Sequence, residues 1–341
     1  MKQKKETLIF VLYDGIKNSV FEGQVLAPLL KKENKNIVII SFEYKPISRD
    51  PEEHLKIITL KKYPFLGKFV LISAIAQLKK VLKKYDNYAV IARGPIAGYI
   101  CAKAINFNAC SSFTIQARGL IAQEYQYAHK DHKNILLRFI HKIRYHQYKA
   151  LEATAYKQNT ALPNTTIEAV SNALKTYIVA QFGVNEKNIT IAKHDIPQTI
   201  DKNLITHWRH KIRTQLQIPF THTVYCYNGS VKPWQCPDKV IDFFENKLKK
   251  DENSFLLILT QDKNQFEKIL KQSTIDQKNY VLKTVAHTDI YKYLAACDCG
   301  IIFRENNIIN WVSRPTKILE YQSVGLKIIH NNTIEILQDV T

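Results

Sequence analysis

The sequence predicts an α/β protein with two Rossmann-like domains, each built on a doubly wound parallel sheet. Short β-branched apolar runs alternate with helical stretches along the whole chain, as parallel strands covered on both faces do. The length of 341 residues fits two α/β domains of ordinary size. Hydrophobic residues make up 45% of the chain, which supplies two cores. We place the domains at residues 1–195 and 196–341, with a linker near 193–203.

The expected strands of the first half are short apolar runs at residues 8–12, 37–41, 57–60, 88–92, 112–115, 167–170 and 189–192. Helices are expected at 20–32 and 172–182. Gly15 follows the first strand, and Arg118 and Gly119 follow the fifth. Because ligands of open parallel sheets bind beyond the carboxyl ends of the strands, these three residues are candidate contacts. Two alternatives stay open: Gly15 as a plain turn residue, and Arg118 as a surface arginine at a helix cap.

The second half repeats this alternation, with strands expected at 223–227, 254–260, 280–283, 299–303 and 326–330 and helices at 204–216, 264–271, 287–296 and 313–324. Gly229 and Ser230 follow the first of these strands, and Lys232 comes just before a proline. Such a turn predicts an anion cradled by backbone N–H groups and one lysine. The alternative is a plain strand-to-helix turn.

The helix at 313–324 is expected to have defined ends. Ser313 is expected to cap it, Pro315 to lie in its first turn and Gly325 to end it. Lys317 and Glu320 are three residues apart, so both face one side near the positive end of the helix dipole. This pattern predicts a phosphate beside the lysine and sugar hydroxyls at the carboxylate. The alternative is an ordinary helix with a surface Lys–Glu pair.

These residues carry a family resemblance. The segment Phe303-Arg304-Glu305…Asn310…Ser313-Arg314-Pro315-Thr316-Lys317…Glu320-Tyr321…Gly325 resembles the donor signature of GT-B glycosyltransferases of family 4, also called group 1. The resemblance implies two domains that face each other across a cleft. It further implies that the first domain binds the acceptor and the second a nucleotide-diphosphate sugar, with no other cofactor.

The resemblance also implies roles for single residues. Glu320 would hold the ribose, while Arg304, Lys232 and Lys317 would be catalytic by offsetting charge on the leaving diphosphate. Further donor contacts would be Gly229, Ser230, Asn310 and Ser313, and the acceptor side would hold Gly15, Arg118, Gly119 and His129. No metal is expected, because fixed cations replace it and no Asp-x-Asp pair is present. Retention of anomeric configuration follows from the resemblance only.

Three positions depart from the family pattern. Val312 stands where many relatives carry a second glutamate, and Gln116 stands where an aspartate is usual. The chain ends at Thr341, so we expect a shortened C-terminal end. These departures put activity in question more than fold.

The charge and the cysteine content of the chain limit the classes of molecule that it is expected to bind. Lys and Arg number 49 against 30 Asp and Glu, a net charge of +19, concentrated partly at 61–85 and 130–149. The second stretch predicts a basic amphipathic helix, either a core helix with a solvated basic face or one lying on an anionic membrane. Basic residues elsewhere are spread over most helices, which does not favour nucleic acid. The six cysteines lack CxxC spacing, which argues against zinc.

The sequence therefore predicts a cytoplasmic glycosyltransferase, peripheral on the inner face of the membrane, that acts on a cell-surface glycan or lipid-linked acceptor. The start lacks a full signal-peptide core, and no stretch holds the 18 or so apolar residues that cross a bilayer. Two alternatives stay open. One is a sugar-nucleotide epimerase of the same fold, and the other is an inactive homologue that serves as a basic membrane- or nucleic-acid-binding scaffold.

Overall fold

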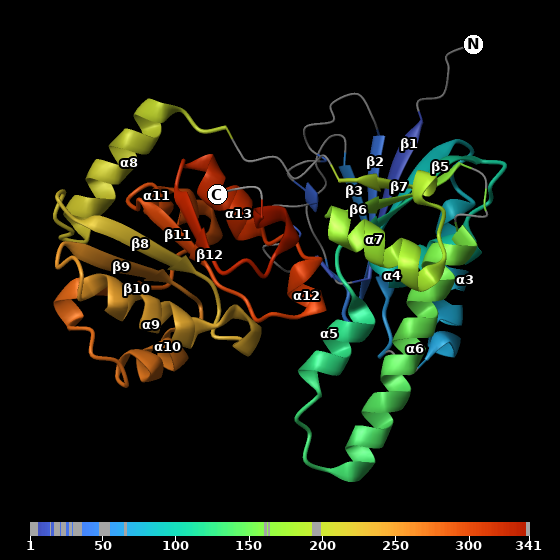
Figure 1. Cartoon of the computed structure of the whole chain (residues 1–341). Coiled ribbons are helices and arrows are strands. Elements are labelled where there is room, and N and C mark those ends of the chain that lie inside the picture. The colour runs from blue at the N-terminus through green and yellow to red at the C-terminus, as the bar shows by residue number, and fades with distance from the viewer. Residues whose placement is uncertain are drawn as a thin grey trace. The chain divides into compact units, whose positions relative to one another are not determined.

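The computed structural model describes residues 6–13, 15–16, 21, 25–26, 29, 36–47, 55–64, 67–159, 162, 164–192 and 199–338. The chain divides into two compact units, Met1–His194 and Asp195–Thr341 (Figure 1). Each unit is built on one parallel sheet, so the predicted fold class is confirmed.

The first unit holds a seven-stranded sheet in the order β3-β2-β1-β4-β5-β6-β7. All of its strand pairs are parallel. Its elements are β1 (Thr7–Leu12), β2 (Asn36–Glu43), β3 (Leu55–Lys61), η2 (Lys68–Val70), α3 (Leu71–Leu82), β4 (Tyr88–Arg93), α4 (Gly94–Ala104), β5 (Cys110–Ala117), α5 (Ile121–Ala128), α6 (Ile135–Asn159), β6 (Thr165–Ala169), α7 (Asn172–Phe182), η3 (Glu186–Asn188) and β7 (Ile189–Ile191).

All seven predicted strands of this unit are present. The helix predicted at 20–32 falls mostly outside the described residues. Within the stretch 61–85, α3 buries Leu71, Ala74, Leu78, Val81 and Leu82 against the unit. Its apolar middle is therefore mainly core.

The second unit holds a five-stranded sheet in the order β10-β9-β8-β11-β12, again with parallel pairs throughout. Its elements are α8 (Lys202–Gln215), β8 (Thr223–Asn228), η4 (Pro233–Gln235), α9 (Pro237–Leu248), β9 (Ser254–Leu259), α10 (Lys263–Leu270), η5 (Gln277–Asn279), β10 (Tyr280–Lys283), η6 (His287–Asp289), α11 (Ile290–Leu294), β11 (Cys299–Ile302), α12 (Ile308–Trp311), α13 (Thr316–Ser323), β12 (Lys327–His330) and η7 (Glu335–Leu337).

Both faces of this second sheet are covered. Along β8, Val224 and Cys226 belong to one apolar core, while Tyr225 and Tyr227 belong to another. Because successive strand side chains point to opposite faces, the two cores lie on opposite sides of the sheet. This explains why the strands read as continuous apolar runs in the sequence.

The predicted ends of the helix at 313–324 need correction. Helix α13 begins at Thr316, with Pro315 at its N-cap and no capping side chain. The Ser313 hydroxyl instead donates to the carbonyl of Asn310 at 2.8 Å, closing the short helix α12, which the sequence did not indicate. Gly325 follows the helix with φ of +74°, the left-handed conformation that ends helices.

Strand order reverses direction once in each sheet. In the first unit the reversal lies between β1 and β4, and in the second it lies between β8 and β11. In doubly wound sheets such a reversal opens a crevice beyond the carboxyl ends of the two strands, where ligands bind. A ligand site in the second unit is therefore expected at the loops that follow β8 and β11.

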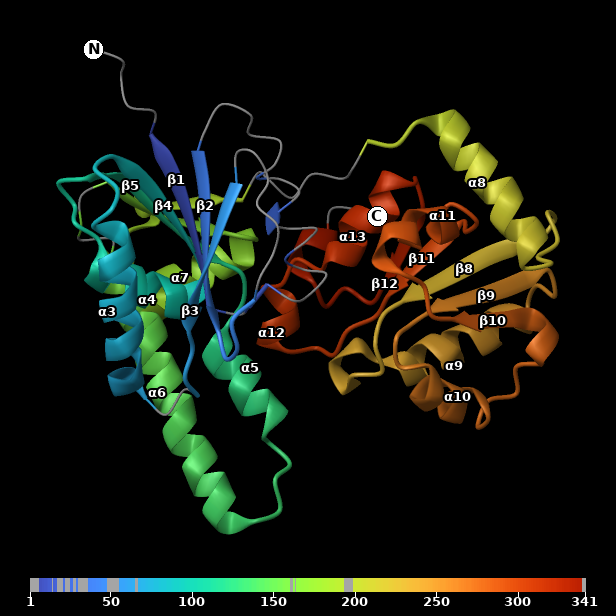
Figure 2. The same cartoon turned by 180° about the vertical axis from the view of Figure 1, so that it is seen from behind.

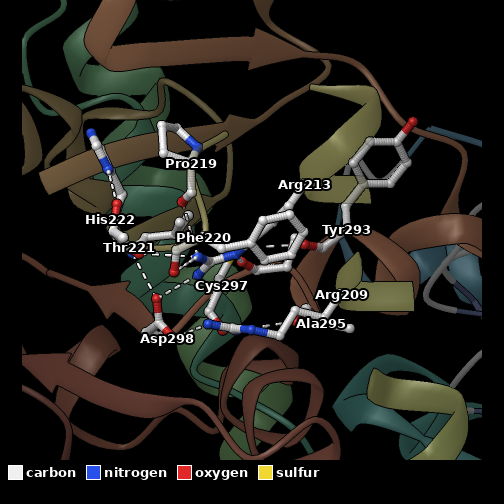
Figure 3. A network of polar contacts seen from close by, with 12 residues as sticks. Arg209, Arg213, Pro219, Phe220, Thr221, His222, Tyr293, Ala295, Cys297 and Asp298 are labelled. Carbon is white, nitrogen blue, oxygen red and sulfur yellow. Dashed lines mark hydrogen bonds and ion pairs between the residues drawn. The ribbon is translucent and has the colours of Figure 1, made fainter. Parts of the chain in front are cut away.

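The amino ends of the same two strands are held by a fully buried arginine. The side chain of Arg213, on α8, has no exposed surface and donates to Asp298 Oδ2 at 2.8 Å (Figure 3). It also donates to backbone carbonyls of two further segments, those of Ala296 at 2.9 Å, His222 at 3.0 Å, and Pro219 and Phe220 at 3.3 Å. One guanidinium thus ties α8 to the segments that enter β8 and β11.

Asp298 completes this network. Its Oδ2 also accepts the backbone N–H of Val224 at 2.8 Å, and its Oδ1 accepts from Arg209 at 2.5 Å. Arg209 is about one-third exposed, whereas Arg213 is fully buried. Arg213 is therefore expected to contribute more to the free energy of unfolding than Arg209 does.

We expect Arg213→Met to lower the unfolding free energy by about 3 kcal/mol, because it leaves buried carbonyls and part of a carboxylate unsatisfied. Arg209→Met is the matched control, and its loss should stay near the ~1 kcal/mol of exposed pairs. Denaturant unfolding of the full chain measures both. Equal losses for the two variants would show that burial of Arg213 does not set the stability.

Candidate functional site

The site is built where β8 and β11 end, at the strand reversal of the second sheet. The two loops that leave these strands touch each other, because the N–H of Glu305 donates to the carbonyl of Trp234 at 3.2 Å. Side chains after β8 and after β11 therefore belong to one site.

Arg304 is the central group of this site. It follows β11 by two residues and is only 8% exposed. One guanidinium nitrogen donates to the neighbouring carbonyl of Phe303 at 3.2 Å, and no carboxylate within the described ranges pairs with it. Burial lowers the pKa of Arg304, and the titratable groups that act on it next most strongly are Tyr227 and Tyr321. A buried cation without a counter-ion is costly, which predicts an anionic ligand.

The backbone of Arg304 is clamped from the segment after β12. Its N–H donates to Asn331 Oδ1 at 3.1 Å, and its carbonyl accepts from Asn331 Nδ2 at 2.7 Å and Thr333 Oγ1 at 3.3 Å. Sequence reasoning missed both partners. Their signal was a run of short polar residues directly after the last strand.

Glu320 is held toward the end of β8. It is 8% exposed, and its Oε2 accepts from Asn228 Nδ2 at 2.6 Å. The backbone N–H of Asn228 donates to the hydroxyl of Tyr321 at 3.1 Å. Gly300 makes room for the Tyr321 ring, since a Cβ at that position would lie 2.3 Å from it. Asn228 is therefore a positioning residue that the sequence did not reveal.

The loop after β8 differs from its prediction. Its backbone N–H groups donate to protein acceptors, namely those of Gly229 to Leu259 O at 3.1 Å, Ser230 to Gln235 Oε1 at 3.1 Å and Val231 to Asp262 Oδ2 at 3.0 Å. These three amides do not form the anion cradle that the sequence predicts. Sequence reasoning missed the side-chain acceptors Gln235 and Asp262, which occupy them.

The same loop leaves one hydroxyl unused. Ser230 Oγ is buried without a hydrogen-bond partner in the described part of the chain. The Ser230 carbonyl accepts from the Tyr227 hydroxyl at 2.6 Å, which fixes the turn. A Cβ on Gly229 would lie 2.6 Å from Gln235 Oε1, so this position needs glycine for close packing. The Ser230 hydroxyl thus keeps unused hydrogen-bonding capacity in the described part of the chain.

The two predicted lysines lie on separate elements of this site. Lys232 is exposed, with its Nζ 5.1 Å from the centre of the Trp234 ring. Lys317 is half-buried in the first turn of α13, one turn before Glu320, and makes no ion pair within the described ranges. That both ammonium groups converge with Arg304 on one ligand remains a prediction.

Asn310 and Ser313 shape the loop between β11 and α13. Asn310 is buried and donates from Nδ2 to the carbonyl of Glu305 at 2.9 Å. Its own carbonyl accepts from Ser313, as described for α12. Both side chains hold the loop that carries Arg304, and this is the role the structure shows for them.

The predicted acceptor-side residues lie on several loops of the first unit. Gly15 adopts φ of +84° after β1, where Glu43 accepts the N–H of Ile16 at 2.9 Å. Arg118 and Gly119 lie between β5 and α5.

Gln116 and His129 are two further residues of the first unit that the sequence singles out. Gln116, at the family's aspartate position, donates to Glu168 at 2.9 Å. His129 lies at the far end of α5, roughly 12 Å along the helix from the sheet edge. There it stacks with Tyr125 and lies beside His141, apart from the loops that carry the other three residues.

A buried carboxyl group supports the start of α5. Glu152, on α6, has no exposed surface and accepts the N–H of Ile121 at 2.7 Å through Oε1, while Oε2 has no partner in the described part. Burial raises the pKa of Glu152 to about 8, although hydrogen bonds from Ile121 and Ala122 act in the opposite direction. Glu152 is therefore largely protonated in the folded protein at neutral pH.

Across the described ranges, no group of three or more His, Cys, Asp or Glu side chains is arranged to hold a metal ion. Within the same ranges, no helix combines the length and the apolar character that crossing a bilayer requires. All six cysteines are free thiols, and five of them are buried.

Comparison with solved structures identifies the fold of this chain. No family model matches the sequence, and no curated protein does. Among solved structures, HepE from Anabaena in complex with UDP is similar with a TM-score of 0.68 at 13% identity, covering 97% of this chain and 82% of that one. WaaG, a glycosyltransferase involved in lipopolysaccharide biosynthesis, is similar with a TM-score of 0.62 at 15% identity, covering 96% and 81%. The lipopolysaccharide outer core galactosyltransferase WaaB gives 0.58 at 14%, covering 96% and 81%. The chain therefore has the GT-B fold.

The pKa of Glu152 makes a prediction about stability. Its folded-state pKa of about 8 lies above the ordinary 4.5, so its contribution is complete below pH 4.5 and is lost as pH rises through about 8. Each pKa unit corresponds to about 1.4 kcal/mol. We expect wild type to lose stability relative to Glu152→Gln between these pH values, as measured by thermal unfolding at several pH values.

The exposed Glu186, which pairs with Lys175 at 2.9 Å and has 70% of its side chain exposed, supplies the matched control. Wild type and Glu186→Gln should show the same pH profile. If Glu152→Gln also follows the wild-type profile, Glu152 is ionised in the folded state and the assignment is wrong.

Proposed function

We propose that this GT-B chain is a glycosyltransferase that moves a sugar from a nucleotide-diphosphate donor to a cell-surface glycan or lipid-linked acceptor. The observation that carries the proposal is the buried guanidinium of Arg304 beside the strand reversal of the second sheet, which pairs with no carboxylate of the described residues. A diphosphate is an anion of suitable charge for that position. The similar structure of HepE was determined with UDP, which supports a nucleotide donor.

In this proposal the two units divide the substrates. The second unit, residues 196–341, binds the donor, because Arg304, Glu320 and Ser230 all lie in its site. The first unit, residues 1–195, binds the acceptor near Gly15, Arg118 and Gly119. This division was expected from the family resemblance, and binding experiments on the full chain test it.

The chemical step needs charge stabilisation at the leaving group. When the glycosidic bond to the diphosphate breaks, negative charge grows on the departing phosphate oxygens. Arg304 lies in a water-poor environment where a fixed cation acts more strongly than in solvent. Lys232 and Lys317 would add cations from neighbouring elements. These residues would offset charge that a metal ion otherwise offsets, so we propose a metal-independent enzyme.

Donor orientation falls to Glu320 in this proposal. Its Oε2 is engaged by Asn228, and Oε1 is left to accept hydrogen bonds from the vicinal hydroxyls of a ribose. The rigid hydroxyl of Ser230 supplies a second polar contact. Asn310 and Ser313 would contribute by holding the loop of Arg304 in place. We keep retention of anomeric configuration as a proposal that rests on family resemblance.

The acceptor would be presented at a membrane. We propose a cytoplasmic protein that associates peripherally with the inner face of an anionic membrane through the basic stretches 61–85 and 130–149. Such a location suits a lipid-linked acceptor.

Two observations favour a second candidate function, an inactive homologue that acts as a scaffold. Val312, at the place of a family glutamate, is fully buried and offers no polar group. Gln116, at the place of a family aspartate, is bonded to Glu168. Binding of a donor without turnover would favour this candidate. A sugar-nucleotide epimerase would need a pair of acid/base carboxylates, and Glu320 is the buried carboxylate that the described part of the site provides.

We expect Arg304→Met to weaken binding of the best nucleoside diphosphate about 30-fold or more, because truncating a buried charge contact costs 2 kcal/mol or more. Stability should stay the same or rise, since an unpaired buried charge is removed. Calorimetric titration with UDP, GDP, ADP and CDP, together with thermal unfolding, measures both. Arg209→Met is the matched control, with unchanged affinity. Unchanged affinity in Arg304→Met, or no binding by wild type, would contradict the proposal.

Glu320→Gln should weaken nucleoside diphosphate binding by about 5- to 30-fold, the effect of losing one charged hydrogen bond. The melting temperature should stay nearly unchanged. The loss should shrink with a 2′,3′-dideoxy nucleotide, because the hydroxyl partners are then absent in both proteins. A large fall in melting temperature, or the same loss with the dideoxy nucleotide, would mean that Glu320 is structural.

A further inference from the structure

The C-terminal end of α5, the loop after it and the first half of α6 form a projection from the first unit, here called the hairpin tip (residues 129–146). In Figures 1 and 2 it extends beyond the sheet of its own unit. Every residue from 130 to 140 is exposed. The buried residues of α6 begin only further along, at Leu151 and Glu152. The first residues of this long helix, 135–140, are therefore not packed into the core of their own unit.

The hairpin tip exposes an apolar stripe. Leu136, Phe139, Ile140 and Ile143 follow the spacing of one helix face, and they are 67%, 60%, 39% and 44% exposed. Ile135, at 80%, extends the stripe toward the loop. Large apolar side chains gathered on one face mark a surface that another apolar phase covers. By contrast, α3 in the stretch 61–85 buries most of its apolar residues, so the hairpin tip is the stronger candidate.

The positive charge of the hairpin tip indicates which kind of partner covers its apolar stripe. Five basic residues fall within 129–146 against the single acid Asp131, and they are Lys130, Lys133, Arg138, Lys142 and Arg144. Two copies of such a surface would repel each other, which argues against self-association. Apolar side chains flanked by lysine and arginine match the interface of a bilayer with anionic headgroups.

Three histidines gather on the same hairpin tip. The ring of His141 lies 4.2 Å from that of His129 and 5.3 Å from that of His132, measured between ring centres. The hydroxyl of Tyr125 lies 2.7 Å from His141 Nδ1. Other groups that face this cluster are Arg144 and Tyr148 on α6, and the loop carries Lys130 and Asp131 close by.

One histidine of the cluster, His141, has a shifted pKa. Desolvation, and then the neighbouring His129, His132 and Arg144, lower the pKa of His141 below its ordinary 6.5. His141 therefore takes up its proton at a lower pH than a free histidine does. An anionic surface nearby would favour the charged form, because it offsets the repulsion among the three rings.

We propose that the hairpin tip inserts into anionic lipid bilayers and that the clustered His129, His132 and His141 strengthen this adsorption as the pH falls. The inference deepens the proposed function, since it names the surface and the partner through which a membrane acceptor is reached. The apolar stripe would enter the headgroup region while the cations meet lipid phosphates. Adsorption itself requires neither a donor nor catalysis, so it is tested separately from them.

The first experiment uses the full chain and sedimentation with vesicles of phosphatidylcholine, alone or mixed equally with phosphatidylglycerol. We expect binding to the anionic vesicles about ten-fold or more tighter than to the neutral ones. Leu136→Ser with Phe139→Ser should weaken it about ten-fold or more, because two buried apolar side chains are lost. The control is Leu204→Ser with Phe220→Ser, which removes two apolar residues of the second unit, 41% and 56% exposed, and should bind like wild type.

The second experiment repeats the binding at pH 7.5 and pH 5.5 with His129→Gln, His132→Gln and His141→Gln combined. Wild type should bind several-fold tighter in acid. The triple variant should bind like wild type at pH 7.5 and gain little at pH 5.5. An acid gain equal to that of wild type would overturn the role of the histidines.

Three outcomes separate this inference from the proposed function. Vesicle binding that is unaffected by the Leu136 and Phe139 substitutions overturns the hairpin tip as the inserting surface. Absence of vesicle binding together with oligonucleotide binding by the same tip assigns it to nucleic acid and overturns the lipid partner. The nucleoside diphosphate affinity of the same samples reports on the donor site alone, so loss of either activity identifies the proposal that fails.

Discussion

A buried guanidinium that pairs with no carboxylate in the part of the chain that the structure describes is the constraint on which the site in the second unit depends. Arg304 is held in place through its backbone by Asn331 and Thr333, and its side chain lies near the hydroxyls of Tyr227 and Tyr321. None of these groups neutralises its charge. A protein keeps such a group when a ligand supplies the missing anion, because replacement by an apolar residue would otherwise be neutral or stabilising.

The residues that stabilise this unit and the residues proposed to contact the ligand lie at opposite ends of β8 and β11. At the amino ends of β8 and β11, Arg213 and Asp298 satisfy each other and the surrounding carbonyls, which fastens α8 to the sheet (Figure 3). At the carboxyl ends of the same strands, Arg304 and Ser230 retain unused charge and hydrogen-bonding capacity. The hydrogen-bonded amino ends of β8 and β11 therefore support the carboxyl ends, where we propose that the ligand binds.

The positions of the strands and the residues at their ends could be predicted from the sequence because they depend on local apolar runs. Arg304 and Glu320 are both buried, and the ligand roles that the family resemblance implies for them stay a prediction. Long-range hydrogen bonds could not be predicted in the same way. Asn228 and Glu320 are 92 residues apart, and Val231 and Asp262 are 31 apart. For this reason the expected anion cradle was filled by protein acceptors, and the expected cap at Ser313 became a bond to Asn310 instead.

The most direct test of the central claim is a crystal structure of the full chain with its preferred nucleoside diphosphate. The account predicts phosphate oxygens within hydrogen-bonding distance of the Arg304 guanidinium, with the ribose hydroxyls at Glu320. A diphosphate bound elsewhere, or a carboxylate of the protein paired with Arg304 while the nucleotide is present, would contradict it.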